Sequence, residues 1–177
     1  MGGYGLKGAA PWWVAVAVVL GDQLTKIWAV ASLDDGPIRL LGDTLAFRLT
    51  RNPGAAFSSF TSGGTALGVV AIIIPLVVSF ALPRMKRRVD QIALALVLGG
   101  AIGNLIDRIF RGDGFLDGAV VDFIDFSFWP TFNVADSGIS VGVVLMLLAA
   151  VVFKPPHEDD ARDKMSGELE RESLNDG

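Results

Sequence analysis

The chain lacks cysteine and has a single histidine, His157, among its 177 residues. The absence of cysteine excludes disulfides, thiol nucleophiles and thiolate metal sites. One histidine, in the charged C-terminal segment, excludes a histidine-rich metal site and argues against a Ser-His-Asp or Cys-His catalytic set. We therefore expect neither a metal ion nor a cofactor.

Charged residues are also few. They make up 19% of the chain, whereas 51% of the residues are hydrophobic and the mean hydropathy is +0.51, which is typical of a membrane protein. The net charge of -4 comes from residues 155–177, which hold eight of the 19 acidic residues but three of the 15 basic ones. The lysine and arginine residues gather most closely in one short connection and are not spread over a face, so we expect no nucleic-acid partner.

Four apolar segments are long enough to cross a bilayer as helices of about 20 residues. They cover residues 12–33, 65–82, 91–110 and 136–153. The sequence therefore predicts a mainly α fold, in which residues 1–153 form a single integral membrane domain with a four-helix bundle. Residues 154–177 are expected to be an acidic, disordered cytoplasmic tail.

The short connection "PRMKRRVD" between the second and third segments carries four basic residues, from Arg84 to Arg88. By the positive-inside rule this connection is cytoplasmic, so both termini are cytoplasmic and the connections 34–64 and 111–135 face outward. Alternating apolar and polar residues in "DTLAFRLTRN" predict one or two short strands over the outer end of the bundle. We expect the first segment to be retained and not cleaved as a signal peptide, because charged residues interrupt it.

Ionisable residues within membrane spans are costly and are candidates for function. Asp22 and Lys26 lie four residues apart in the first segment, a spacing that favours an intrahelical ion pair. The outer ends of the third and fourth segments hold a second group, with Asp122 in the connection between them; this group comprises Asp107, Arg108, Asp122 and Asp136. All four side chains are predicted to meet at the outer interface.

Two carboxyl groups brought close together share a proton, because both cannot ionise cheaply. Such a pair can activate water and protonate the leaving amine of a peptide bond. Asp122 and Asp136 are candidates, but Asp136 could equally cap the helix that follows it. Asp122 could equally form an ion pair with Arg108 or Arg111, and Asp125, three residues further on, is not distinguished from Asp122 by periodicity.

Two other functions are compatible with the residues. A serine-lysine peptidase would use Ser58 or Ser59 as nucleophile and Lys26 as base, since burial lowers the pKa of a lysine. A small proton-coupled transporter would use Asp22, Asp107 and Asp136 as a relay. The transporter ranks last because its polar groups gather at one side of the membrane. Asp113 and Asp117, in a glycine-rich loop, are expected to be solvated turn residues.

Five motifs occur in a characteristic order along the chain: "DQLTK" at 22–26, "RNPGAAFS" at 51–58, "GNLIDR" at 103–108, "VVDFID" at 120–125 and "FNVADSGISVG" at 132–142. In this order, on a chain with four spans, they resemble lipoprotein signal peptidase, the signal peptidase II family of bacterial membrane aspartyl endopeptidases. The resemblance covers nearly the whole chain from the first span to the last.

The resemblance implies that Asp122 and Asp136 are the catalytic pair and that Asp125 has a supporting role. It further implies that a polar set holds the substrate backbone and orders the pair; this set comprises Asn52, Gly54, Asn104, Asp107, Arg108 and Asn133. For Asp22 it implies a structural role within the span, and we expect the same of Lys26.

The implied substrate is a prolipoprotein whose cysteine carries a diacylglyceryl group, cut on the amino side of that cysteine. The implied location is the bacterial plasma membrane, with the site near the outer face, surrounded by membrane lipid. We expect a monomer. The connection 109–119 is longer than is usual in the family, and the acidic tail lies outside the family pattern.

Overall fold

The computed structural model describes residues 8–54 and 63–152, with the backbone alone for residues 63–68. The described part is mainly helical, with four α-helices: α1 (Ala10–Ser32), α2 (Gly63–Ala81), α3 (Arg88–Phe110) and α4 (Val134–Val152). A short 3-10 turn, η1 (Leu82–Arg84), follows α2. Contacts divide the chain into a unit ending at Met146 and a second unit from Leu147 onward. The sheet and the candidate site lie entirely in the first unit.

The four helices confirm the four predicted segments to within about three residues at each end. Helices α1, α3 and α4 are long and apolar enough to span a membrane, and within α2 and η1 the apolar helix Val69–Arg84 is shorter. α1 begins with Pro11 in its first turn, where the missing amide hydrogen is not needed. Pro75 lies inside α2 without ending it.

Close packing of the helices depends on glycines of α3. A side chain on Gly99 would place its first carbon 2.7 Å from the backbone oxygen of Ala15 in α1. On Gly100 it would collide with the backbone oxygen of Ala135 in α4. Glycine at these positions therefore lets three helices approach one another, as expected for small residues in membrane bundles.

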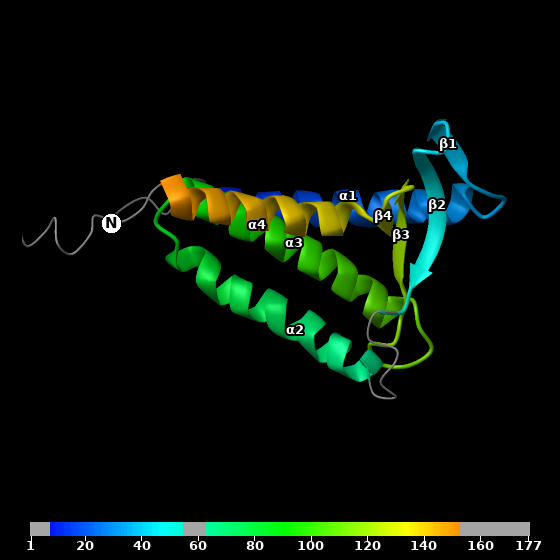
Figure 1. Cartoon of the computed structure of the whole chain (residues 1–177). Helices are drawn as coiled ribbons and strands as arrows, with labels where there is room; N and C mark the ends of the chain where they lie inside the picture. Colours follow the sequence, from blue (N-terminus) through cyan, green and yellow to red (C-terminus); the bar gives the residue numbers. More distant parts are fainter. Residues whose placement is uncertain (1–7, 55–62, 153–177) are drawn as a thin grey trace, which may run out of the picture. The chain divides into compact units, whose positions relative to one another are not determined.

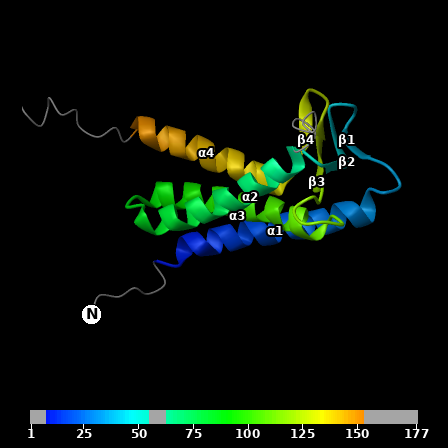
Figure 2. The same ribbon diagram turned by 90° about the horizontal axis from the view of Figure 1, so that it is seen from below.

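A four-stranded antiparallel sheet covers one end of the helices, in the order β1 (Ile38–Leu41), β2 (Leu45–Asn52), β3 (Val120–Phe126) and β4 (Trp129–Phe132). Figures 1 and 2 show this sheet where α1 and α3 end and α4 begins. The sequence analysis predicted one or two strands and located them in the first outer connection. The second connection supplies two more. They were not predicted, because β3 is buried and its sequence reads as an apolar run.

Aromatic side chains attach the sheet to α1. Trp28 lies edge-on against Phe47 of β2 at a centroid distance of 5.3 Å and against Phe123 of β3 at 6.1 Å. Phe123 packs with Ala29 and Leu33 in one buried cluster. In the β2–β3 register, Thr50 lies opposite Asp122 and Asn52 opposite Val120. This register brings the end of β2 to the middle of the candidate site.

Candidate active site

Asp122 lies in β3 and is 2% exposed. Its two carboxylate oxygens accept hydrogen bonds from two amides that are distant in sequence. Asn52 Nδ2 donates to Oδ2 at 3.2 Å, and Asn133 Nδ2 donates to Oδ1 at 2.6 Å. The predicted alternative, an ion pair of Asp122 with Arg108 or Arg111, is not formed by either arginine, and Arg111 Nε instead bonds to Asp107 Oδ1 at 2.7 Å.

Asp136 lies in the first turn of α4, which begins at Val134, two residues earlier than predicted. Its backbone amide donates to Asn133 Oδ1 at 2.9 Å, and its carboxylate accepts from the backbone amide of Asn133 at 3.3 Å. This reciprocal pair is a capping box in which Asn133 caps the helix. The predicted alternative, in which Asp136 itself is the cap, is therefore corrected: Asp136 is the third helical residue, and its second oxygen is available for other contacts.

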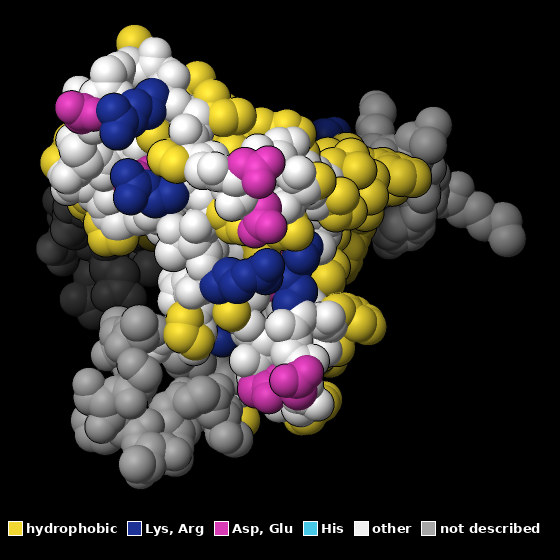
Figure 3. All heavy atoms as spheres, turned by 90° about the vertical axis from the view of Figure 1, so that its right-hand side faces the viewer, with side chains coloured by type: hydrophobic (Ala, Val, Ile, Leu, Met, Phe, Trp, Pro, Cys, Tyr) yellow, Lys and Arg dark blue, Asp and Glu magenta, His cyan; other side chains and the backbone are white. Residues whose placement is uncertain are grey.

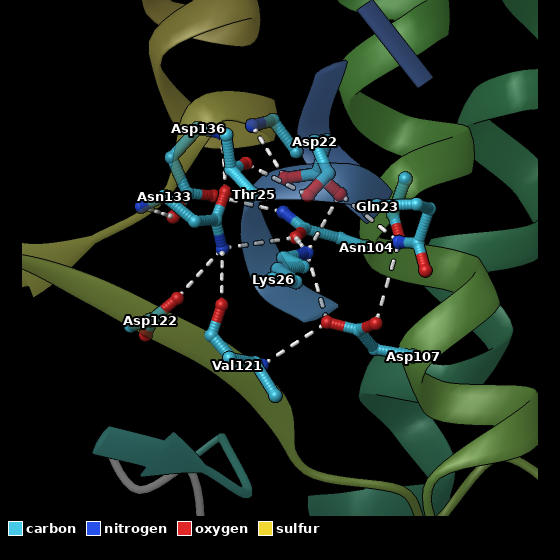
Figure 4. Close-up of polar contacts among 12 residues, drawn as sticks. Asp22, Gln23, Thr25, Lys26, Asn104, Asp107, Val121, Asp122, Asn133 and Asp136 are labelled. Carbon is cyan, nitrogen blue, oxygen red and sulfur yellow. Dashed lines mark hydrogen bonds and ion pairs between the residues drawn. The ribbon is translucent and has the colours of Figure 1, made fainter. Parts of the chain in front are cut away.

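Two amide side chains connect the carboxylates (Figure 4). Asn104 Nδ2 in α3 donates to Asp136 Oδ1 at 2.8 Å. Asn133 Nδ2, which contacts Asp122, also lies 3.2 Å from Asn104 Oδ1. Asp122 and Asp136, from a strand and a helix 14 positions apart in sequence, are thus linked through Asn133 and Asn104.

The surroundings of Asp122 favour its protonated form. Burial raises the pKa of the Asp122 carboxyl to about 6, and the nearby carboxylate of Asp136 raises it as well. The hydrogen bonds from Asn52 and Asn133 lower it again but do not offset the burial. Up to about pH 6, Asp122 therefore holds a proton that an exposed aspartate would have lost.

A cavity of about 420 Å³ opens over the two carboxylates. Its polar wall holds Asn52, Asn104, Arg108, Asp122 and Asp136, and its apolar wall comes from α2, α3 and α4 and includes Val70, Ile74, Val97, Ile139 and Val143. Such a mixed lining suits a ligand with one polar and one apolar part.

Asn52 reaches the site because of the turn that follows it. Gly54 has a φ of +90°, which favours glycine, and its backbone amide donates to Asn52 Oδ1 at 2.9 Å. The oxygen of the Asn52 amide is occupied by this bond, so its nitrogen points to Asp122. Arg108 lines the cavity beside them, half-buried, and its charge interacts with that of Asp122.

A second group of charges lies directly beneath the carboxylate pair. Lys26 Nζ is 2.8 Å from Asp22 Oδ2 and 2.8 Å from Asp107 Oδ2, and all three side chains are 0% exposed. Lys26 also donates to Asn104 Oδ1 at 3.0 Å. Lys26 Nζ is thus occupied by three acceptors and does not line the cavity, so it is poorly placed to be the base of a serine-lysine site. Ser58 and Ser59 lie outside the described residues.

Two participants were missed by the sequence reasoning. Gln23 Nε2 donates to Asp22 Oδ2 at 3.1 Å and to the backbone oxygen of Gly103 at 3.0 Å. Arg111 holds Asp107 across one helical turn, a spacing that could have been recognised as an ion pair. Gln23 carries no such signal, because its partner on α3, the backbone oxygen of Gly103, lies 80 residues away.

Other predicted candidates lie apart from the pair. Asp125 Oδ2 is 2.8 Å from Arg48 Nε on the sheet surface. Asp113 and Asp117 are exposed, and Asp117 accepts from the backbone amide of Gly114 at 3.0 Å within its turn. Among the described residues, no three His, Asp or Glu side chains are grouped to hold a metal ion. The tail with His157 is outside the described residues.

Fold and site together are those of a helical membrane protein with two aspartates lining one cavity. Residues 14–152 match the family described as "Signal peptidase (SPase) II" (Peptidase_A8). The chain therefore belongs to the signal peptidase II family of aspartic peptidases, which confirms the resemblance drawn from the five motifs.

Relatives of known name support this assignment. The chain is 44% identical over 144 residues to the lipoprotein signal peptidase of Rhodococcus jostii (strain RHA1), covering 81% of this chain and 73% of that one. It is 40% identical over 139 residues to that of Mycobacterium tuberculosis (strain ATCC 25618 / H37Rv), covering 78% and 69%. A bacterial membrane enzyme solved by the in meso method at 1.9 Å resolution aligns with a TM-score of 0.71 and 31% identity, over 80% of this chain and 92% of that one.

Proposed function

We propose that this membrane peptidase removes signal peptides from prolipoproteins with Asp122 and Asp136 as its catalytic pair. The observation that carries the proposal is the convergence of both carboxylates on one cavity, where Asn104 and Asn133 hold them in a continuous hydrogen-bond network. Side chains from β3, α3 and α4 meet there although they are distant along the chain.

The two carboxyl groups differ in a way that suits acid–base catalysis. The raised pKa of Asp122 makes it the carboxyl of the pair that retains a proton. In the proposed reaction Asp136 takes a proton from water as the water oxygen attacks the scissile carbonyl carbon. Asp122 gives its proton to the leaving nitrogen, and the carbon–nitrogen bond breaks.

Polar neighbours can stabilise the tetrahedral intermediate. The guanidinium of Arg108 lines the same cavity, and the Asn52 amide lies at its edge. Both are hydrogen-bond donors, and donors fixed before the reaction stabilise developing negative charge on the carbonyl oxygen.

The apolar part of the cavity supports a lipid-modified substrate. Val70 and Ile74 of α2 and Val143 of α4 line the cavity, yet they remain 49%, 41% and 44% exposed. The cavity is therefore open sideways, toward the region that lipid tails would fill. A diacylglyceryl-cysteine could enter from the bilayer, keep its acyl chains among apolar side chains and present its peptide bond to the aspartates.

The distribution of charge supports an orientation with the site at the outer face of a bacterial plasma membrane. The basic connection from Arg84 to Arg88 lies at the end of α2 and α3 opposite the sheet (Figure 1). By the positive-inside rule that end is cytoplasmic, as are both termini. Charged side chains also cover part of the sheet end, beside hydrophobic ones (Figure 3), as expected for a surface in water next to lipid. A monomer holds every residue of the proposed site.

The proposal is tested by cleavage of a purified prolipoprotein, with and without its diacylglyceryl group, in detergent. Wild type should cut the lipidated form alone, and Asp122→Asn and Asp136→Asn should be inactive although folded. A variant that cuts at nearly the wild-type rate would show that the aspartates are not the catalytic pair. Equal cleavage of both substrate forms would contradict the proposed lipid requirement and leave the catalytic pair in place.

A further inference from the structure

The buried charge cluster of Asp22, Lys26 and Asp107 has no part in the reaction proposed above. Burying three ionised groups is costly even when they are paired, and hydrophobic residues of the same size would often serve stability equally well. The contacts that the cluster makes beyond its own ion pairs therefore bear on its purpose.

Each carboxylate of the cluster holds the backbone immediately before one catalytic aspartate. Asp22 Oδ1 accepts from the backbone amide of Ala135 at 2.9 Å, and the next residue is Asp136. Asp107 Oδ2 accepts from the backbone amide of Val121 at 3.0 Å, and the next residue is Asp122. Because Lys26 binds both carboxylates at 2.8 Å, the backbone segments that precede Asp122 and Asp136 are both connected to one ammonium group.

A third contact runs through side chains. An ammonium group can only donate hydrogen bonds, so the atom of Asn104 that faces Lys26 at 3.0 Å must be the amide oxygen. The amide nitrogen then faces Asp136, 2.8 Å from Oδ1. Lys26 thus determines that Asn104 presents a donor, and not an acceptor, to Asp136.

We infer that Lys26 is a positioning residue of the active site: it fixes the placement of Asp122 and Asp136 relative to each other through Asp107, Asp22 and Asn104. The inference rests on the proposed catalytic role of the two aspartates. It assigns a function in catalysis to a side chain that is fully buried and does not line the cavity.

The test compares Asp22→Asn with the double variant Asp22→Asn/Lys26→Met in the full-length protein. Asn at position 22 keeps an oxygen that can accept from Ala135, and Asp107 keeps Arg111. The double variant loses one negative and one positive charge, so its cluster has the same net charge as that of wild type. Comparison with Asp22→Asn isolates the ammonium group with its contacts to Asp107 and Asn104.

We expect kcat for the lipidated prolipoprotein to be at least about tenfold lower in the double variant than in Asp22→Asn, since small displacements of catalytic groups are costly. KM should stay within about twofold, because the cavity walls are untouched. Arg48→Met, which breaks a surface ion pair with Asp125, is the control with unchanged kcat. Thermal denaturation establishes that each variant is folded.

The pH profile gives a readout that a purely structural role would not change. The charge of Lys26 lowers the pKa of Asp122. Removing this charge should therefore move the limb of the kcat–pH profile that reports Asp122 to higher pH. The other groups that face Asp122 are not substituted in either variant: Asp136 from α4, Arg108 from α3, and the amides of Asn52 and Asn133.

A second double variant keeps the inference falsifiable if the methionine variant does not fold. Asp22→Asn/Lys26→Gln retains a donor toward Asn104, and its kcat should lie above that of the methionine variant but below Asp22→Asn. If the double variant that folds has the same kcat as Asp22→Asn and an unshifted limb of the pH profile, the inference is overturned. The proposed function would still stand if Asp122→Asn and Asp136→Asn are inactive. Active aspartate variants would overturn the proposed function and the inference with it.

Discussion

Asp122 and Asp125 lie three residues apart on β3 and have opposite surroundings. Asp122 is 2% exposed and is held by two neutral amides near a second carboxylate. The Asp125 side chain is 21% exposed and forms an ion pair with Arg48 on the sheet surface. The comparison shows that burial, neutral partners and a like charge turn an aspartate into an acid near pH 6, whereas an arginine at the surface makes only an ordinary ion pair.

The largest effect is expected at the other member of the pair. Asp136→Asn removes the proposed base and should lower kcat by about 10³-fold, in the range that acid–base groups contribute. Asp43→Asn is the control, because Asp43 is a 91% exposed partner of Arg39. Cleavage of lipidated prolipoprotein measures both, and a loss of less than about tenfold in Asp136→Asn would contradict the assigned role.

Two smaller effects, on stability and on kcat, are expected at Asn133, which caps α4 and joins the two carboxylates. Asn133→Ala should lower the free energy of unfolding by at least about 1 kcal/mol through the lost cap. It should also lower kcat by about 10- to 100-fold, because Asp122 loses its 2.6 Å partner. Thr131→Ala is the control, since Thr131 contacts Asp125 instead. Equal losses of kcat in the two variants would contradict the bridging role.

The raised pKa of Asp122 predicts a gain of stability on its removal. The folded state holds a proton up to about pH 6, above the usual value of 3.8, so ionisation of Asp122 costs stability as the pH rises through this window. Asp122→Asn avoids that cost. At pH 8 it should be more stable than wild type by up to about 3 kcal/mol, with the advantage shrinking toward pH 4.

Thermal denaturation at pH 4, 6 and 8 measures this gain. Asp125→Asn, on the same strand, should instead lose a little stability, because it breaks the contact with Arg48. A stability difference between Asp122→Asn and wild type that does not change with pH would show that Asp122 is not the carboxyl that retains the proton.

The smallest effect is expected on the sheet surface. Arg48→Ala removes an ion pair in which Arg48 is 59% exposed, and such pairs contribute at most about 1 kcal/mol. Activity should be unchanged, because neither partner lines the cavity. If Arg48→Ala lowered kcat as much as Asn133→Ala does, the sharp division between the two regions would be wrong.

The helices could be predicted because their signal is local. Runs of about 20 apolar residues indicate spans, and the four helices are present. The sheet was underestimated for the same reason. β3 pairs with β2, some 70 residues earlier, and a buried strand has no alternation to separate it from an apolar span.

The candidate site shows more clearly what the local sequence does not predict. Residue spacing left Asp122 and Asp125 equal, since the sheet register and Asn133 decide which one is buried, and neither is visible in the local sequence. Spacing likewise predicts the Asp22–Lys26 pair but not its contact with Asp107, which comes from another helix. Only the family motifs distinguished Asp122 from Asp125 and paired it with Asp136.

The most direct test of the account is a comparison of Asp122→Asn with Asp125→Asn in single-turnover cleavage of lipidated prolipoprotein. Both substitutions neutralise an aspartate of the same strand, so their effects on charge and on strand structure are matched. The account predicts no detectable product from folded Asp122→Asn and a near wild-type rate from Asp125→Asn. Similar rates for the two variants would contradict the claim that the buried pair of carboxylates performs the reaction.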